Sequence, residues 1–435
     1  MIEKKSNEEE KIEKRNPWSW IPSLYFAEGL PYVIVTFVAT VMYKQMKISN
    51  ADIALYTSWL YLPWVIKPLW SPVVDLLKTK RFWIYTMQLI IGAGIAGVAL
   101  TIPMPHFFQL TLAFFWLLAF SSATHDIAAD GFYMLALSES RQSFFVGIRS
   151  TFYRIAMITG QGLLVILAGF LENRFTIQFA WIFTFGAVGI LFVIFFIYHR
   201  FILPHPKDDK HIQYSRNQSL FTEFFKTFLR FFEEKKILLI ILFMLLYRLG
   251  ESQLLKIAPL FLLDKREVGG LGLSLTDIGF LYGTVGIIAL MLGGIIGGFA
   301  VSRKGLKFWL LPMLFAINLP NALYIYLAYA QPTNMWIVYA CVAGEQLTYG
   351  FGFTAFLVYM MYVSDGEFKA SHYAICTGFM ALGMMVPGMF SGMIQEALGY
   401  KTFFIYVVLT IIPSLFILKF IPLEYSYGKK KTTES

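Results

Sequence analysis

Charged residues are scarce in this 435-residue sequence. Asp, Glu, Lys and Arg together make up 14% of it, against about 25% in a typical soluble domain. Hydrophobic residues make up 57%, and the mean hydropathy is +0.61. Apolar runs of about 20 residues recur along the whole chain, which indicates a helical protein that crosses a bilayer many times. The alternating pattern of an outer-membrane barrel is absent.

Cysteine and the common catalytic motifs are also scarce or missing. The two cysteines, Cys341 and Cys376, both lie in apolar runs, so they form neither a disulfide framework nor a CxxC metal motif. No GxxxxGK[ST] run is present to bind nucleotide, and no HExxH or GxSxG run supports hydrolysis in the membrane. We therefore expect neither an enzyme nor a bound cofactor or metal. In a membrane protein, the net charge of +9 reflects topology rather than nucleic-acid binding.

Twelve membrane-spanning helices are predicted from the apolar runs, which makes the chain an all-α integral membrane protein. The longest polar stretch, 199–236, separates six predicted spans from six, a pattern that suggests duplicated halves. The predicted spans are 18–43, 52–75, 82–103, 107–136, 144–171, 177–200, 237–263, 275–301, 306–330, 334–363, 371–397 and 400–421. The predicted parts are a tail over 1–17, a six-helix bundle over 18–200, a linker over 201–236, a second bundle over 237–421 and a basic tail over 422–435.

The loops between spans differ in their basic residues. Loops 103–107 and 331–334 contain no Lys or Arg. Other polar segments are rich in them, with Lys78, Lys80 and Arg81, then Arg303, Lys304 and Lys307, and then the tail 429–431. Because basic loops stay in the cytoplasm, we predict an inner-membrane protein with both termini cytoplasmic. The polar residues before the first span lack a cleavage site of small residues, so we expect that span to be retained.

The linker contains an amphipathic segment that begins at Ser219 and reads SLFTEFFKTFLRFF. Ser219 is a suitable N-cap, and Lys226 and Arg230 would face lipid headgroups. We predict an interfacial helix that tethers the two halves. The alternative is a simple extension of the seventh span.

The sharpest polar signal lies inside the fourth predicted span, where Ser122–Asp130 reads SATHDIAAD. An ionised carboxylate at that depth costs about 2.5–3.5 kcal/mol on insertion scales. Asp126 and Asp130 lie about 40° apart around a helix and therefore share a face. Neighbouring carboxylates favour proton coupling or substrate contact in a water-lined cavity. The alternative is a static ion-pair cluster with Arg149 or Arg154, and His125, on another face, fits helix packing better.

Glu28 is the second candidate for protonation. It precedes Gly29 and Pro31, and such residues inside a span weaken backbone hydrogen bonding and often mark a bend beside a cavity. Its alternative role is to neutralise Lys67 in the second span.

The remaining intramembrane charges balance these acids or bind an anionic substrate. Arg248 and Glu251 lie three residues apart on one helical face, so they either pair with each other or leave the arginine to attract an anion. The full set of charge-balancing or anion-binding candidates is Lys67, Arg149, Arg154, Arg248, Glu251, Lys256 and Glu345. Because both signs occur in both halves, mutual neutralisation is possible.

Three short motifs resemble those of the AmpG-type permeases and their acetyl-CoA transporter relatives. Lys67–Asp75 reads KPLWSPVVD and is similar to K-x-LW-[SA]-P-x-x-D in that family. Ser122–Asp130 is similar to its S-A-x-Q-D-I-x-x-D run, with His125 in place of the usual Gln. Gly29–Pro31 matches its GLP. The three motifs occur in the family's order and spacing.

The resemblance implies a major facilitator fold of two six-helix bundles, alternating access and proton-driven transport. It implies anhydro-muropeptides as substrates, with Asp126 and Asp130 as the matched polar pair. Asp75, Lys78, Lys80 and Arg81 resemble the facilitator gate between spans two and three, although Leu76 stands where that gate has a base. We expect a monomer that takes protons and a small-molecule substrate. Acetyl-CoA, a siderophore or a drug-like compound are alternative substrates, and a non-transporting receptor is the alternative class.

Overall fold

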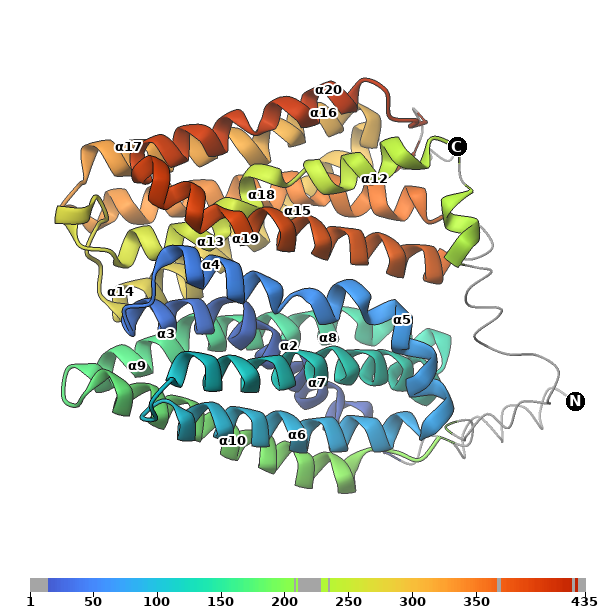
Figure 1. The fold of residues 1–435 in the computed structure, drawn as a ribbon. Coiled ribbons are helices and arrows are strands. Elements are labelled where there is room, and N and C mark those ends of the chain that lie inside the picture. The colour runs from blue at the N-terminus through green and yellow to red at the C-terminus, as the bar shows by residue number, and fades with distance from the viewer. Residues whose placement is uncertain are drawn as a thin grey trace, which may run out of the picture. The chain divides into compact units, whose positions relative to one another are not determined.

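Helices make up all of the regular secondary structure in the part of the chain that the computed structural model describes (Figure 1). The structure describes residues 15–206, 209, 228–233, 235–365, 369–424 and 427–428. The chain divides into two compact units, with residues 1–42 and 66–220 in the first and residues 43–65 and 221–435 in the second. Segment 43–65 therefore packs with the second unit, although it precedes most of the first in the sequence.

The first unit is a bundle of long helices around an apolar core. Its core contains Trp20, Leu24, Tyr25 and Phe132, each with at most 1% of its surface exposed. In chain order its helices are η1 (Pro17–Ser19), α2 (Ile21–Val33), η2 (Ile34–Val38), α6 (Lys80–Thr101), α7 (Phe107–Ala136), α8 (Glu139–Ile158), η3 (Thr159–Leu164), α9 (Val165–Glu172) and α10 (Ile177–Ile202). Helices α3 (Ala39–Gln45) and α5 (Leu62–Leu77) cross the junctions between the units.

The second unit is also helical throughout its described part. Its largest core cluster includes Phe243, Tyr247, Phe356 and Tyr359. Its helices are α4 (Asn50–Trp59), α12 (Ile237–Leu246), α13 (Leu249–Leu263), η4 (Arg266–Val268), α14 (Leu275–Phe280), η5 (Leu281–Gly286), α15 (Ile287–Lys304), α16 (Leu306–Asn318), η6 (Leu319–Asn321), α17 (Ala322–Ala330), α18 (Met335–Val363), α19 (Lys369–Leu409) and α20 (Ile411–Leu418).

The predicted spans correspond to these helices. Nine helical stretches in the described part are long and apolar enough to cross a membrane, and the last of them, His372–Leu418, covers most of both final predicted spans. The two predicted spans outside these stretches are 52–75, which the structure divides between α4 and α5, and 334–363, which is α18. Helix α19 is interrupted at Gly399, whose φ of 69° suits glycine, and this break lies between predicted spans 371–397 and 400–421.

Most of the predicted interfacial helix, including Ser219 and Lys226, lies outside the described residues. Residues 228–232 are helical, and Phe231 is fully buried in the core cluster of the second unit. Phe231 lies 6.3 Å, centroid to centroid, from the ring of Phe379 on α19. The tethering role of the segment stays a prediction.

Helix α2 packs closely on α8 because Gly29 has no side chain. A Cβ atom at Gly29 would lie 2.9 Å from the carbonyl oxygen of Tyr153 and 3.0 Å from the Cβ of Ala156. The α2 helix continues into the π-helical turn η2, and α8 continues into the π-helical turn η3, where Gly160 faces Val33. Such turns often occur at functional sites. The close approach of α2 and α8 brings their polar side chains together.

Candidate functional site

The first unit contains an ion pair between the second and fourth predicted spans. Lys67 on α5 forms it with Asp126 on α7. The Lys67 side chain is 29% exposed and that of Asp126 is 21% exposed, so the protein does not seal this pair. Lys67 is thus placed as a counter-charge to Asp126.

Asp130, one helical turn after Asp126, pairs with a different base. Its carboxylate lies 3.1 Å from the guanidinium of Arg149 on α8 and accepts a hydrogen bond of 3.2 Å from the hydroxyl of Tyr25 on α2. The Arg149 guanidinium also donates to the Tyr25 hydroxyl at 3.0 Å and lies over the rings of Tyr25 and Tyr133. Asp130 keeps 38% of its side chain exposed. These contacts fix the orientation of Arg149 while leaving Asp130 accessible.

Glu28 on α2 reaches the same cluster and is 8% exposed. Its carboxyl group forms a hydrogen bond with the carboxyl group of Asp126. A hydrogen bond between two carboxyl groups requires that one of them carry a proton, because an ionised carboxylate is an acceptor only. The second Glu28 oxygen, Oε2, meets no hydrogen-bond partner among the described residues. A carboxyl pair of this kind between α2 and α7 is stable only when one of its members is protonated.

Charge balance in the first-unit cluster leads to the same result. Its acids are Glu28, Asp126 and Asp130, and its bases are Lys67 and Arg149. The cluster has one carboxyl group more than it has bases. Because an uncompensated charge is costly inside a membrane protein, the excess carboxyl group is the natural place for a proton.

Arg154, the other base predicted to balance the aspartates, lies elsewhere. It is exposed on α8, and the described part of the chain offers it no ion pair. Five residues separate it from Arg149, and only Arg149 lies on the face of α8 that meets α2 and α7.

The predicted gate residues lie at the start of α6 and before it. Lys78 is exposed, with its ammonium 5.8 Å from the centre of the Phe82 ring. The backbone amides of Lys80 and Arg81 donate to the carboxylate of Asp209 at 2.7 and 3.1 Å. Asp209 thus caps the N-terminus of α6, a contact that the sequence did not suggest. The side chain of Asp75 lies outside the described part of the structure.

In the second unit, Arg248 and Glu251 pair with each other, which was one of the two alternatives that their spacing in the sequence allowed. The guanidinium of Arg248 lies 2.9 Å from the carboxylate of Glu251, which is fully buried at the start of α13. The guanidinium also donates to the Tyr349 hydroxyl on α18 at 2.7 Å and lies over the Phe353 ring. Oε1 of Glu251 has no hydrogen-bond partner among the described residues.

Glu345 and Lys256 are buried without an ion pair to any described residue. Glu345 on α18 accepts a hydrogen bond of 2.9 Å from the amide of Gln346, and its Oε1 has no partner in the described part of the chain. Lys256 on α13 donates to the hydroxyl of Thr57 at 2.9 Å and lies over the Tyr61 ring. The two residues are therefore buried polar groups of opposite sign that do not neutralise each other.

A buried hydrogen-bonded chain lies beside the first-unit cluster. The amide of Gln88 on α6 contacts His125 at 3.0 Å and His199 at 2.9 Å, and His199 contacts the Ser23 hydroxyl at 2.9 Å. His125 is 1% exposed, which agrees with the packing role expected for it. Sequence inspection missed Gln88 and His199 because a single polar residue in a long apolar run gives no indication of its partner.

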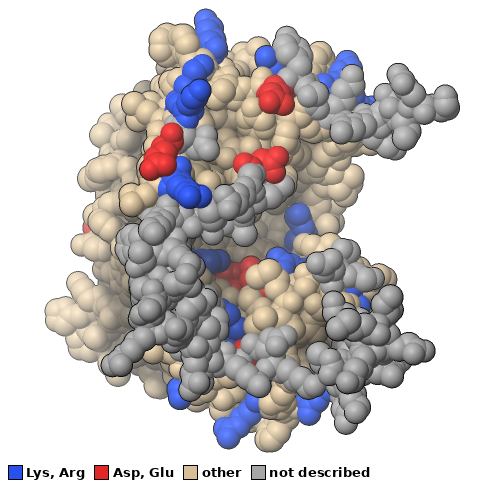
Figure 2. Space-filling view, turned by 90° about the vertical axis from the view of Figure 1, so that its right-hand side faces the viewer, with Lys and Arg blue, Asp and Glu red and all other residues tan. Residues whose placement is uncertain are grey.

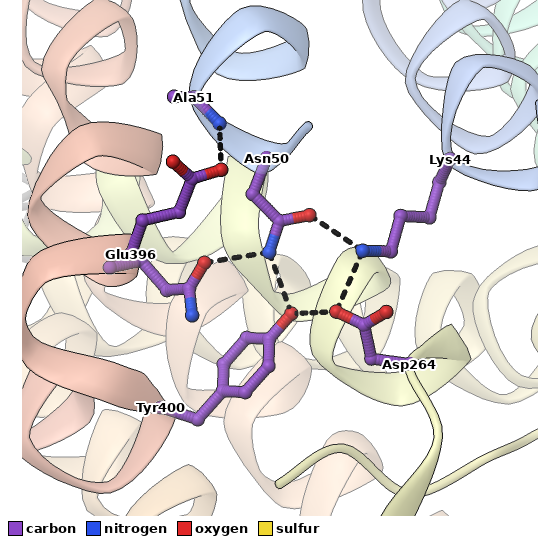
Figure 3. A network of polar contacts seen from close by, with 7 residues as sticks. Lys44, Asn50, Ala51, Asp264, Glu396 and Tyr400 are labelled. Carbon is purple, nitrogen blue, oxygen red and sulfur yellow. Dashed lines mark hydrogen bonds and ion pairs between the residues drawn. The ribbon is translucent and has the colours of Figure 1, made fainter. Parts of the chain in front are cut away.

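The second unit also holds the polar network of Figure 3, which joins segment 43–65 to α13 and α19. Lys44 donates to Asp264 and to Asn50, each at 2.7 Å. Asn50 donates to Tyr400 at 2.9 Å, and the Tyr400 hydroxyl donates to Asp264 at 2.5 Å. Glu396 accepts from the backbone amide of Ala51 at 2.9 Å, and Gln395 accepts from Asn50 at 2.6 Å. This network fixes the start of α4 against α19.

Metal ligation has no support in the described residues, since no group of three or more His, Cys, Asp or Glu side chains is placed to hold an ion there. What the two clusters offer instead is exchange of protons and recognition of charged groups.

Known proteins resemble this chain over most of its length. Residues 23–367 match the family model described as Major Facilitator Superfamily. The anhydromuropeptide permease of Escherichia coli (strain K12) is 25% identical over 405 residues, covering 91% of this chain and 77% of that protein. A protein of Rickettsia conorii (strain ATCC VR-613 / Malish 7) named putative transporter AmpG 4 is 25% identical over 412 residues, covering 92% of this chain and 94% of its own.

Solved structures show the same fold at low sequence identity. The nucleoside transporter NupG superposes with a TM-score of 0.68 at 16% identity, covering 93% of this chain and 98% of its own. A D-xylose-proton symporter superposes with a TM-score of 0.70 at 11% identity, covering 95% of this chain and 99% of its own. At these identities the likeness shows the helical arrangement and carries no information on substrate.

Proposed function

Because the chain belongs to the Major Facilitator Superfamily, we propose that it is a proton-coupled secondary transporter that carries anhydro-muropeptides across the inner membrane by alternating access. Glu28, Asp126 and Asp130 bind and release the coupling proton. Lys67 and Arg149 hold the two aspartates in place, and the aspartates compete with substrate anions for these two bases.

One observation carries the proposal: the Glu28 and Asp126 carboxyl groups share a hydrogen bond in a cluster with more acids than bases. A static structural cluster needs no such excess, because each acid would have its own base. The exposed fractions of Asp126 and Asp130 also support water access, since an ion pair facing lipid at mid-span would be expensive.

The substrate class comes from the relatives together with the available charges. The E. coli relative is named an anhydromuropeptide permease, and the three sequence motifs resemble those of the same group. A polyanion such as acetyl-CoA would need several converging bases that are not already neutralised. Here Lys67, Arg149 and Arg248 each have an acidic partner, which favours a substrate with fewer negative charges.

Both termini are proposed to be cytoplasmic. Lys78, Lys80 and Arg81 gather where α6 begins, and Figure 2 shows Lys and Arg side chains, with some Asp and Glu, on the face that lies at the right of Figure 1. Basic residues that flank spans favour the cytoplasmic side. The protein acts as a monomer in this proposal, and Asp75, Lys78, Lys80 and Arg81 form a gate at the same end.

The test is uptake of radiolabelled anhydro-muropeptide into proteoliposomes with an imposed pH gradient. The wild type should accumulate substrate when the outside is acidic and stop when a protonophore collapses the gradient. Asp126→Asn combined with Asp130→Asn should abolish accumulation. Uptake that ignores the gradient, or that survives the double substitution, rules out this coupling mechanism.

A further inference from the structure

The carboxyl cluster of the first unit has a counterpart in the second unit. In the first unit, α2 contributes Glu28 and α7 contributes Asp126, and these two carboxyl groups contact each other. In the second unit, α13 contributes Glu251 and α18 contributes Glu345, and these two carboxyl groups interact electrostatically. Helices α2 and α7 are the first and fourth predicted spans, and α13 and α18 are the seventh and tenth. The acids thus come from corresponding helices of the two halves.

The correspondence extends one helical turn along each helix. Four residues after Asp126 comes Asp130, and four residues after Glu345 comes Tyr349. One arginine bonds to Asp130 and another to Tyr349. In the first unit Arg149 lies 3.1 Å from Asp130. In the second unit Arg248 donates to the Tyr349 hydroxyl at 2.7 Å. In both units, therefore, two carboxyl groups come from corresponding helices, and an arginine bonds to the residue one turn after the second of them.

The second cluster differs from the first in its bases. Arg248 pairs with Glu251 at 2.9 Å, and no described base pairs with Glu345 in the way that Lys67 pairs with Asp126. Glu345 is 2% exposed and has one oxygen without a hydrogen-bond partner. A buried carboxylate without a base is strongly disfavoured, so the stable form of this group carries a proton.

None of the described bases forms an ion pair with Glu345, and the one base of this cluster, Arg248, pairs with Glu251 instead. The titratable groups that face Glu345 in the described part are Glu251 on α13, Tyr282 on η5 and Tyr324 on α17. The neighbouring α15 and α16 have their charged residues near their ends, at 303, 304 and 307, and Glu396 and Lys401 of α19 lie beside its break at Gly399. No described residue around Glu345 therefore neutralises its carboxylate, and a proton does so instead.

We propose that Glu345, together with Glu251, forms a second proton-binding site, equivalent to the site of Glu28 and Asp126. Each cluster then holds one more carboxyl group than it has ion-paired bases and binds one proton, so the transporter moves two protons with each substrate. Glu345 takes a proton from water on one side and returns it to water on the other, and no other bond changes. This inference rests on the proposed transport function.

Glu345→Gln tests the site because glutamine mimics a carboxyl group that is permanently neutral. In proteoliposomes this variant should exchange labelled for unlabelled anhydro-muropeptide at the wild-type rate when no net proton movement is needed. Accumulation driven by a pH gradient should fall to the level of vesicles without protein. Glu267→Gln, the same change at an exposed position of the second unit, is the matched control and should accumulate substrate normally.

Two further measurements keep the proposal open to disproof even if Glu345→Gln does not fold. The wild-type ratio of protons to substrate, taken from the pH gradient that just balances a substrate gradient, should be two, and a ratio of one overturns the proposal. Glu345→Asp should keep gradient-driven accumulation with an altered pH profile, and an unaltered profile also counts against the proposal.

The outcomes separate failure of the second site from failure of the proposed function. If wild-type protein accumulates substrate and Glu345→Gln does so equally, the second site fails while the proposed function stands. If the wild type shows no gradient-driven uptake, the proposed function itself fails.

Discussion

The ion pair of Lys67 with Asp126 makes removal of one partner worse than removal of both. Asp126→Asn leaves the ammonium without its carboxylate. Losing one partner of a fully buried pair costs about 3–5 kcal/mol, and partial exposure of this pair should reduce the cost to about 1–3 kcal/mol. The double variant Lys67→Met with Asp126→Asn should recover most of that loss in thermal unfolding of the purified protein. A double variant no more stable than the single one would show that the pair is not coupled.

Arg149 and Arg154 provide a matched comparison on one helix. Arg149→Gln removes the base from Asp130 and a hydrogen-bond donor from Tyr25, so substrate accumulation should drop sharply. Arg154→Gln changes an exposed residue and should leave accumulation near the wild-type level. Uptake measurements at equal protein amounts check both. Equal losses in the two variants would mean that the Asp130 contact is not the reason Arg149 matters.

Residue types in the spans could be read from the sequence, but their partners could not. The high cost of charge inside a membrane makes Asp126, Asp130 and Glu28 conspicuous in any apolar run. The choice between Arg149 and Arg154 depends on which face of α8 meets α2, and hydropathy does not contain that information. Tyr25 could have been found, because it lies three residues before Glu28 on the same helical face.

Gly29 is required by the contact of α2 with α8 rather than by backbone flexibility. A methyl group there would meet the backbone oxygen of Tyr153 at 2.9 Å, which a side-chain movement cannot relieve. We expect Gly29→Ala to destabilise the protein by about 1–3 kcal/mol, as overpacking does elsewhere. On α8 itself, Gly147→Ala meets nothing within 4 Å and should be neutral or stabilising by up to about 1 kcal/mol. Thermal unfolding in detergent compares the two, and equal effects would contradict this account of the contact.

Helix boundaries followed from hydropathy where the apolar run is continuous, as in α7, whose bounds match the predicted span of 107–136. The predicted span of 52–75 is instead divided at residues 60 and 61, just before Pro63. A hydropathy window averages over residues on both sides of such a break and so does not detect it, although Pro63 indicates that a helix ends or begins there. The π-helical turns η2, η3 and η5 were not predicted, since one extra residue in a helical turn leaves the apolar pattern almost unchanged.

The fold of the whole chain could be recognised from three motifs and the number of apolar runs, and the comparisons confirm the family. The repetition of the acidic cluster could not be seen in the sequence. Its members are Glu28 and Asp126 in one half and Glu251 and Glu345 in the other, and each is a single residue in a different apolar context. Only the folded chain shows that these residues come from corresponding helices and that each pair interacts electrostatically.

Alternating access predicts that the network of Figure 3 opens and closes during transport. Helix α4 lies against α19 here, with the Ala51 amide bonded to Glu396 and Lys44 paired with Asp264. Under the proposed topology these contacts lie at the external ends of the spans, so substrate entry from outside requires them to separate.

Cysteines at positions 51 and 396, introduced by Ala51→Cys and Glu396→Cys after Cys341→Ser and Cys376→Ser, should be joined by a short bifunctional methanethiosulfonate reagent. The cross-linked protein should lose uptake of anhydro-muropeptide, because α4 can no longer separate from α19. A reductant that cleaves the cross-link should restore uptake. Each single-cysteine variant, treated in the same way, controls for modification alone. Uptake that continues in fully joined protein would mean that α4 and α19 stay together throughout transport, and the entry pathway would then have to lie elsewhere.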